Sequence, residues 1–279
     1  MSSTRLTRRG RIASAVAVLL IAAGTIAVVV DAGAHAPIST PLHSTTPFAK
    51  TACADLVVLG LRGSGQSTSK DQGVGAEVLG SVREMATRLH SDLRSAKTAI
   101  RLEAVLFPAR YAPTLAAYEA GISTGEKMVR ARLTALSSHC PDSHFALIGF
   151  SQGANVVHAF ADSLTAKQSR RLVLVAMIAD PFKNPADTIR AYSYSTSTPG
   201  PGKYGVGPLF DRATRDRAIT FCVRKDEICN RPADGGPSEV TSTHRTFYEQ
   251  PATTRQTGRE LVRTLRRGTA DPPHAEQWP

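Results

Sequence analysis

The sequence predicts an α/β fold, a three-layer sandwich in which a central, mostly parallel sheet carries helices on both faces. Short apolar runs rich in β-branched residues alternate along the chain with longer stretches in which apolar residues recur at helical spacing. This alternation is typical of βαβ units, which build parallel sheets. The length of 279 residues and the hydrophobic content of 42% are enough for one substantial core. We therefore expect one folded domain.

Five apolar runs are predicted to form strands and four periodic stretches to form helices. The run Leu56–Leu61 is continuous and is followed by Arg-Gly-Ser-Gly, as expected of a buried strand that ends in a turn. The other predicted strands are 100–107, 145–150, 171–178 and 218–223. The predicted helices are 74–93, 114–136, 152–164 and 256–267. Residues 193–207 are dense in Ser, Thr, Pro and Gly and predict a long loop.

The first 36 residues have the composition of an export segment. Several arginines precede an uncharged apolar run from Ile12 to Val30, and small residues follow it. The pattern predicts an export signal over 1–36 or an uncleaved N-terminal membrane anchor, because the apolar run is nearly long enough to span a bilayer. Residues 37–50 predict a linker, 51–268 the folded domain and 269–279 a disordered tail. We expect the domain to be secreted or associated with the cell envelope, outside the cytoplasm.

The formal net charge of +11 makes the chain basic. Such a charge favours association with anionic partners, and an anionic envelope surface is one that fits. The predicted last helix has an arginine face opposite its apolar residues that could rest on such a surface, formed by Arg255, Arg259, Arg263, Arg266 and Arg267. The basic residues are otherwise scattered and no nucleic-acid-binding motif accompanies them, so no nucleic-acid partner is predicted. We expect a monomer.

The chain has four cysteines, Cys53, Cys140, Cys222 and Cys229. In an exported protein they predict two disulfides, and the sequence alone allows three pairings. No Cys-x-x-Cys motif and no histidine cluster with ligand spacing accompany them, so no metal site is predicted. The glycine-rich stretch 200–205 lacks the spacing of a phosphate-binding loop and predicts a flexible loop. No cofactor is predicted.

Residues 149–153 carry the strongest functional signal. Gly149-Phe150-Ser151-Gln152-Gly153 fits the Gly-x-Ser-x-Gly nucleophile elbow of the α/β-hydrolase fold, in which a tight turn from strand to helix raises the serine hydroxyl above the sheet. A predicted strand precedes the motif and a predicted helix follows it, which is the context that the elbow requires. We therefore predict Ser151 as the nucleophile.

A serine nucleophile needs an imidazole base, and that base needs a carboxylate to orient it. In α/β-hydrolases the order along the chain is serine, acid, histidine, which excludes every histidine before Ser151. His158 follows Ser151 too closely to reach back to it, and His274 lies in a Pro-rich tail. This leaves His244 as the predicted base.

Two aspartates fit the position of the acid. Asp226 lies between Cys222 and Cys229 and precedes His244 by a plausible loop length. Asp180 follows a predicted strand, where α/β-hydrolases often present their acid. The order of residues along the chain admits both.

Five motifs together give the chain a resemblance to a known family. They are Cys53-Ala-Asp55, Arg62-Gly-Ser64, Gly149-Phe-Ser-Gln-Gly153, Cys222-Val-Arg-Lys-Asp226-Glu-Ile-Cys229 and His244-Arg-Thr-Phe-Tyr248. In this content and order the chain resembles the cutinase family, including the cutinase-like esterases and lipases of actinobacterial envelopes. The acid loop departs from the family pattern in carrying Arg224-Lys225 before the aspartate.

The resemblance implies a set of roles for individual residues. Ser151, Asp226 and His244 would be the catalytic residues, and the backbone N–H groups of Ser64 and Gln152 would form the oxyanion hole, with the Ser64 hydroxyl assisting. The disulfides would join Cys53 to Cys140 and Cys222 to Cys229.

The activity implied is that of a serine carboxylic ester hydrolase, which acts through an acyl-enzyme on a small-molecule or lipid ester. The substrates would be fatty acyl esters or lipid esters of the cell envelope. Phospholipase, thioesterase or acyltransferase action is an alternative within the same chemistry, because several acceptors can intercept an acyl-enzyme. A catalytically silent envelope-binding protein of the same fold is the alternative from another class.

Overall fold

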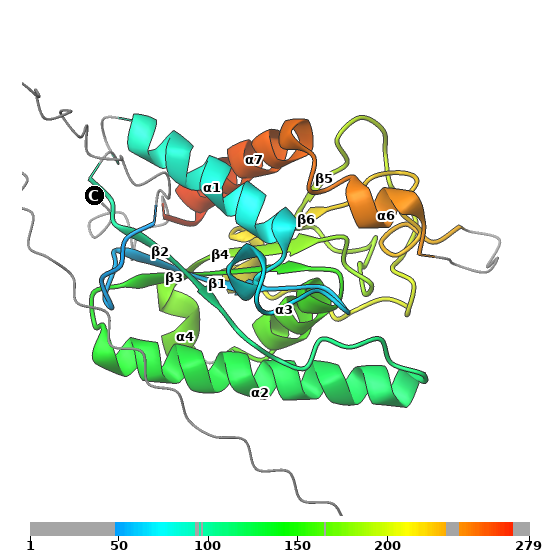
Figure 1. The fold of residues 1–279 in the computed structure, drawn as a ribbon, viewed down its shortest axis with the longest axis horizontal. Coiled ribbons are helices and arrows are strands. Elements are labelled where there is room, and N and C mark those ends of the chain that lie inside the picture. The colour runs from blue at the N-terminus through cyan, green and yellow to red at the C-terminus, as the bar shows by residue number, and fades with distance from the viewer. Residues whose placement is uncertain (1–47, 93–94, 96, 165, 233–239, 270–279) are drawn as a thin grey trace, which may run out of the picture. The chain divides into compact units, whose positions relative to one another are not determined.

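A computed structural model shows the predicted three-layer arrangement (Figure 1). The structure describes residues 48–92, 95, 97–164, 166–232 and 240–269. The predicted export segment, most of the predicted linker and nearly all of the predicted tail lie outside these residues.

The central layer is a parallel sheet in the order β2-β1-β3-β4-β6-β5. Its strands are β1 (Leu56–Leu61), β2 (Ile100–Ala104), β3 (His144–Phe150), β4 (Leu172–Ile178), β5 (Arg190–Tyr192) and β6 (Ala218–Phe221). Strands β1, β3, β4 and β6 are buried along their whole length, which explains why they are continuous apolar runs in the sequence. All strands of the described sheet run in one direction, so their carboxyl ends meet at one edge.

Helices cover both faces of the sheet (Figure 1). Helices α1 (Ala76–Ser91) and α7 (Pro251–Thr269) pack against each other on one face, while α2 (Leu115–His139) and α3 (Gln152–Asp162) pack against each other on the other. The short helix α4 (Ala166–Arg171) leads into β4. This arrangement confirms the predicted fold class.

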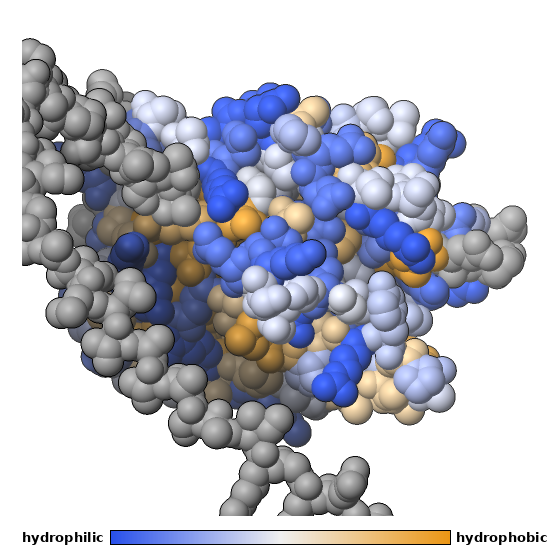
Figure 2. Space-filling view, viewed as in Figure 1, coloured by the Kyte–Doolittle hydropathy of each residue, from blue (hydrophilic) through white to orange (hydrophobic). Residues whose placement is uncertain are grey.

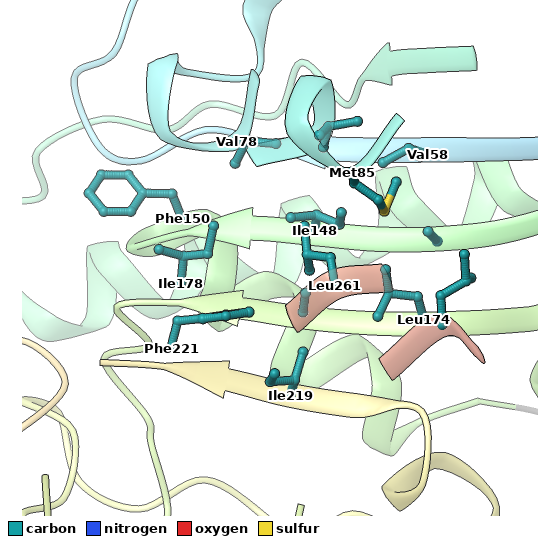
Figure 3. Close-up of a cluster of buried hydrophobic side chains, with 14 of the residues drawn as sticks. Val58, Val78, Met85, Ile148, Phe150, Leu174, Ile178, Ile219, Phe221 and Leu261 are labelled. Carbon is teal, nitrogen blue, oxygen red and sulfur yellow. The ribbon is translucent and has the colours of Figure 1, made fainter. Parts of the chain in front are cut away.

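Two hydrophobic cores fill the spaces between the layers, one on each face of the sheet. In the core under α1 and α7, Val78, Met85 and Leu261 meet Val58 and side chains of the central strands (Figure 3). The core under α2 and α3 contains Phe107, Phe145 and Phe160, all fully buried. Burial of apolar surface on this scale is the main force that holds such a sandwich together.

The structure also contains short elements that sequence patterns did not predict. They are the 3₁₀ turn η1 (Asp71–Gly73), α4, β5, α5 (Arg212–Arg215) and α6 (Ser242–Thr246). Each is too short to show a hydrophobic period, and β5 is an edge strand of mixed exposure. The predicted helix 256–267 begins earlier, at Pro251, because proline is favoured in the first turn of a helix.

The surface of the domain mixes hydrophilic and hydrophobic side chains on the face drawn in Figure 2. On α7 the predicted apolar residues Leu261, Val262 and Leu265 are buried, and the five predicted arginines are exposed. Three of these arginines form ion pairs, Arg259 and Arg263 with Glu260 and Arg266 with Asp92. Among the described helices, none has the length and apolar character needed to cross a membrane.

Candidate active site

Ser151 lies at the turn between β3 and α3, as the elbow motif predicts. Its backbone has φ 52° and ψ −116°, a conformation that a non-glycine residue adopts only at a cost of about 1–3 kcal/mol. The flanking glycines permit the turn: a Cβ atom at Gly149 would lie 2.2 Å from the Gly153 oxygen, and one at Gly153 would lie 2.3 Å from the Leu61 oxygen. The Ser151 hydroxyl is thereby raised at the carboxyl edge of the sheet.

His244 and Asp226 complete a line of hydrogen bonds that begins at Ser151. Ser151 Oγ lies 3.0 Å from His244 Nε2, and His244 Nδ1 lies 2.9 Å from Asp226 Oδ2. His244 is carried by α6, and its ring stacks on Phe150 with centroids 5.0 Å apart. A carboxylate at Nδ1 fixes the tautomer in which Nε2 is free to accept a proton. The geometry thus brings together the three residues that the sequence predicted as nucleophile, base and one of two candidate acids.

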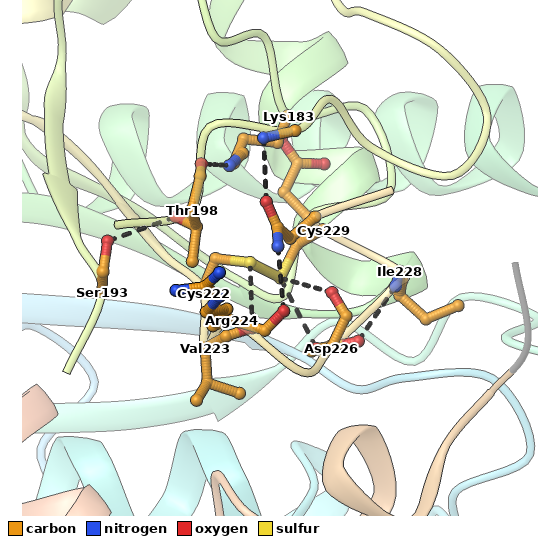
Figure 4. The surroundings of a disulfide bond; sticks show 12 residues. Lys183, Ser193, Thr198, Cys222, Val223, Arg224, Asp226, Ile228 and Cys229 are labelled. Atoms are coloured by element: carbon orange, nitrogen blue, oxygen red, sulfur yellow. Dashed lines mark hydrogen bonds between the residues drawn. A yellow bond between two sulfur atoms is a disulfide. The ribbon is translucent and has the colours of Figure 1, made fainter. Parts of the chain in front are cut away.

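Asp226 is fully buried, and its loop is closed by the disulfide between Cys222 and Cys229 (Figure 4). Asp226 Oδ1 accepts a hydrogen bond of 3.0 Å from the Ile228 N–H, and Oδ2 accepts one of 2.8 Å from the Tyr248 hydroxyl. The buried carboxylate therefore has one hydrogen-bond donor from its own loop and one from Tyr248, beside the His244 ring.

Tyr248 is a residue of the site to which sequence reasoning gave no role. Its hydroxyl accepts from the Val223 N–H at 3.1 Å while it donates to Asp226. Burial raises the pKa of Tyr248 well above its ordinary value, so the hydroxyl stays a donor. The signal in the sequence was its place at the end of the motif His244-Arg-Thr-Phe-Tyr248, to which no separate role was given.

Asp180, the rival acid, lies elsewhere. Its carboxylate accepts from the Phe182 N–H at 2.9 Å and lies 2.6 Å from His158 Nδ1. Asp180 and His158 are both almost completely buried and contact neither Ser151 nor His244 through any hydrogen bond of the described residues. The structure therefore places Asp226, and not Asp180, beside the predicted base.

The loop after β1 brings Ser64 next to the elbow. A Cβ atom at Gly63 would lie 3.3 Å from Ser151 Cβ, and the Ser64 hydroxyl donates to Gln152 Oε1 at 2.8 Å. Gln152 is the first residue of α3, so its backbone N–H has no partner within the helix. The predicted oxyanion residues thus flank Ser151 from two sides.

Gln66, another residue that sequence reasoning did not predict, fixes the shape of this loop. Its side chain accepts from the Gly63 N–H at 2.7 Å and donates to Glu77 at 2.7 Å. Arg62 binds the Gln66 carbonyl at 2.9 Å and the Phe107 carbonyl at 2.9 Å. Burial raises the pKa of Glu77, which lies at the start of α1. These contacts hold the turn of the predicted oxyanion hole before substrate arrives.

A cavity of about 340 Å³ opens over Ser151 and His244. Most of its other lining residues are aromatic or apolar, including Tyr111, Tyr118, Phe150, Pro181, Tyr204, Ile228 and Val240. Polar groups enter it at a few points: Ser64, Gln66, Glu77, Lys203 and Arg245. An apolar cleft with a few polar groups next to a nucleophile is the usual form of a small-molecule site.

The four cysteines form the two disulfides that the resemblance implied, Cys53–Cys140 and Cys222–Cys229. The Cys53–Cys140 bond joins the segment before β1 to the segment before β3. Cys53, His139 and Cys140 lie close enough together to suggest a metal site, but both sulfurs are used in the disulfide and are not thiolate ligands.

The parallel sheet, the strained serine at the end of β3 and the line of hydrogen bonds to His244 and Asp226 define a protein of the α/β-hydrolase class. Comparison with known proteins gives the family. The family model for cutinase matches residues 52–257, so the chain belongs to the cutinase family. This match confirms the family that the five motifs predicted.

Individual relatives are distant. The chain is 27% identical over 134 residues to the cutinase CUT1 of Coprinopsis cinerea and 26% identical over 145 residues to a cutinase of Botryotinia fuckeliana. These matches cover 48% and 52% of this chain, and 61% and 66% of the two relatives. A solved cutinase-like protein from Cryptococcus sp. shares the fold, with a TM-score of 0.57 and 18% identity over 77% of this chain and 97% of the other.

Proposed function

We propose that the chain is a serine carboxylic ester hydrolase with Ser151 as nucleophile, His244 as base and Asp226 as the acid that orients it. The observation that carries the proposal is the unbroken line from Ser151 Oγ to His244 Nε2 at 3.0 Å and from His244 Nδ1 to Asp226 Oδ2 at 2.9 Å. A binding protein has no need of this arrangement, in which a serine is held in a strained conformation beside an oriented imidazole.

The reaction follows from these contacts. His244 Nε2 takes the hydroxyl proton as Ser151 Oγ attacks the acyl carbon, and the buried Asp226 stabilises the imidazolium that forms. Negative charge on the carbonyl oxygen is met by the backbone N–H groups of Ser64 and Gln152. His244 then gives its proton to the leaving alcohol. A water molecule, activated by His244 in the same way, releases the acid and restores Ser151.

The cavity supports fatty acyl esters as substrates. Its volume of about 340 Å³ is at the lower end of the usual range for ligand sites, which favours acyl chains of short to medium length. Its aromatic and apolar lining suits an acyl chain, and lipid esters of a cell envelope offer the same group. Export of the protein from the cytoplasm agrees with its two disulfides, because such bonds persist in oxidising compartments. Export and an envelope substrate therefore belong to the proposal.

Hydrolysis of p-nitrophenyl esters from acetate to laurate by the purified protein tests the proposal. We expect Ser151→Ala to abolish turnover, and Asp226→Asn to lower kcat by about 10⁴, because an amide at this position favours the wrong tautomer of His244. Asp162→Asn, which changes an exposed aspartate at the end of α3, is the matched control and should leave kcat unchanged. A folded wild-type protein that hydrolyses none of these esters would overturn the proposal and favour a silent envelope-binding protein.

A further inference from the structure

One wall of the cavity is formed by two segments that follow β4. We call residues 180–183 and 202–208 together the pocket wall. It contributes Pro181, Lys203 and Tyr204 to the lining of the cavity. Backbone hydrogen bonds join the two segments at 2.9, 3.0 and 2.7 Å: Gly202 N–H to the Lys183 oxygen, Tyr204 N–H to the Pro181 oxygen and Gly207 N–H to the Phe182 oxygen. The segments therefore move as a unit, and their attachment to the sandwich decides the shape of the cavity.

His158 of α3 attaches the pocket wall at two points. Its Nδ1 lies 2.6 Å from Asp180 Oδ2, and its Nε2 lies 2.9 Å from the Pro208 oxygen. The ring is only 2% exposed and is stacked on Phe210, with centroids 4.8 Å apart. A Cβ atom at Gly207 would lie 2.6 Å from His158 Cε1, which shows how closely the wall approaches the ring.

Both ring nitrogens of His158 face acceptors. A carboxylate oxygen and a peptide carbonyl oxygen can only accept, and a neutral imidazole has a single N–H, so both contacts are satisfied only by the imidazolium form. Burial lowers the pKa of His158, but the Asp180 carboxylate, the Pro208 oxygen and Asp187 together outweigh it, so the pKa is raised above the ordinary value.

The charged and titratable groups around this ring come from several elements. Asp180 follows β4, and Asp187, on the segment leading to β5, also favours the charged ring. Tyr118 of α2 and Lys183 of the pocket wall face Asp180 in turn. Burial lowers the pKa of Lys183 to about 8, and its ammonium group donates to the Thr198 oxygen.

We propose that His158 is a positioning residue: as an imidazolium it holds the pocket wall against α3 and so sets the binding of the substrate, while it takes no part in proton transfer at Ser151. The inference rests on the proposed function. Loss of the proton leaves one ring nitrogen facing an oxygen without a hydrogen between them, so the wall loosens as the pH rises through the pKa of His158. The expected signature is a KM that rises at alkaline pH for substrates that touch the wall, with an unchanged kcat.

Asp180→Asn provides a sharp test because it preserves the contacts without the charge. The amide nitrogen introduced at position 180 can donate to Nδ1 of a neutral ring, Nε2–H can still donate to Pro208, and the amide oxygen can still accept from Phe182. His158→Gln cannot make both contacts of the ring. We therefore expect His158→Gln to raise KM for p-nitrophenyl octanoate about tenfold, the effect of one lost charged hydrogen bond, with kcat changed less than twofold. Asp180→Asn should keep the wild-type KM at pH 6.5 and show no rise in KM at higher pH.

The experiment measures kcat and KM from pH 5.5 to 9.5 for p-nitrophenyl acetate and octanoate, with ¹⁵N chemical shifts of the His158 ring recorded in parallel. The Asp180 carboxylate also raises the pKa of Lys183, so Asp180→Asn shifts the titration of Lys183 as well. The ring shifts therefore assign the kinetic change to His158: the change in KM must follow the titration of the His158 ring. If His158→Gln fails to fold, the Asp180→Asn profile alone carries the kinetic test.

Two results would overturn the inference. One is a neutral His158 ring at pH 6.5 in the wild-type protein. The other is an active wild type whose KM for octanoate has the same pH dependence as that of Asp180→Asn. A wild type without any esterase activity would instead overturn the proposed function, and the ring shifts would still report whether His158 is an imidazolium.

Discussion

At the scale of single residues, hydrogen bonds from several donors hold the buried Asp226 carboxylate in place. It is 0% exposed, and its two oxygens accept from the Ile228 N–H, the Tyr248 hydroxyl and the His244 ring. An unpaired carboxylate in such a place would become protonated or destabilise the fold. Because these donors are fixed by the loop and by Tyr248, the orientation of His244 depends in part on Tyr248, a residue that does not line the cavity.

Replacing Tyr248 by phenylalanine tests this dependence. The change removes a donor to Asp226 and leaves the Val223 N–H without its partner. We expect kcat to fall about tenfold with little change in KM, and the free energy of unfolding to fall by about 2 kcal/mol. Ester hydrolysis and urea unfolding measure the two effects.

Tyr194→Phe is the matched control. Tyr194 is partly buried and packs against Tyr248, but its hydroxyl contacts Thr257 and not Asp226. We expect this variant to lose some stability and to keep its kcat. Equal losses of kcat in the two variants would show that packing, and not the bond to Asp226, is responsible.

The residues of the candidate site differ in how far the sequence reveals them. Ser151 and His244 follow from a local motif and from the order along the chain, which need no three-dimensional information. Asp226 and Asp180 each follow a strand, so their order along the chain does not separate them. The resemblance implies Asp226, and the structure places Asp226 beside His244 and Asp180 beside His158. The contacts of Tyr248 and Gln66 depend on chain segments meeting in space, so no local pattern announces them.

At the scale of elements, we expect one disulfide mainly to stabilise the fold and the other mainly to restrain the loop that carries Asp226. Cys53–Cys140 closes a loop with a sequence separation of 87 and joins segments at the amino ends of β1 and β3. Cys222–Cys229 closes one with a separation of 7 and surrounds Asp226. The entropy lost by the unfolded chain grows with loop length, so the larger loop should stabilise the fold more, by about 4.6 kcal/mol against about 2.4 kcal/mol.

We therefore predict opposite rankings for stability and activity. Replacing both Cys53 and Cys140 by serine should cost more free energy of unfolding, with kcat at room temperature little changed in the folded fraction. Replacing both Cys222 and Cys229 should cost less stability but lower kcat at least tenfold, because the Asp226 loop loses its restraint. Urea unfolding and ester hydrolysis on the same samples decide the matter, and the same ranking in both measurements would contradict the prediction.

The elbow makes a second prediction at this scale. A methyl group at Gly153 would lie 2.3 Å from the Leu61 oxygen and 2.7 Å from the Arg62 oxygen, so α3 could not approach β1 as it does. Gly153→Ala should lower the free energy of unfolding by about 3 kcal/mol. At Gly205 the backbone φ is +110° but the space is open, so Gly205→Ala should cost only about 1 kcal/mol of backbone strain. Equal costs in urea unfolding would argue against the close packing at Gly153.

Long helices and strands, which show a clear pattern of apolar residues, were predicted from the sequence, whereas short helices and strands were not. The four long helices and the five longer strands lie where apolar periodicity placed them, within a few residues. Strand β5 has only the residues Arg190–Tyr192, and α6 only Ser242–Thr246, so neither can display a period. Such elements form because neighbouring segments hold them: β5 pairs with β6, and Thr241 caps the helix that carries His244.

For the molecule as a whole, the same buried groups that shape the cavity make stability depend on pH in two opposite ways. The pKa of His158 is raised on folding by Asp180, so the folded state binds more protons than the unfolded state between pH 6.5 and that raised value. Stability from this pair is complete below pH 6.5 and is lost as the pH rises. Burial lowers the pKa of Lys183 from 10.5 to about 8, so the unfolded state binds more protons between these values, and stability rises with pH there.

Two variants separate these contributions in urea unfolding from pH 5.5 to 10.5. Removing the buried ammonium group in Lys183→Met should stabilise the protein relative to wild type below pH 8, by on the order of 2 kcal/mol, and this advantage should disappear toward pH 10.5. His158→Gln should instead be destabilised relative to wild type at pH 6, and its deficit should shrink as the pH rises. An advantage of Lys183→Met that is the same at every pH would show that Lys183 keeps its ordinary pKa in the folded protein, and a constant deficit of His158→Gln would show the same for the ring that holds the pocket wall.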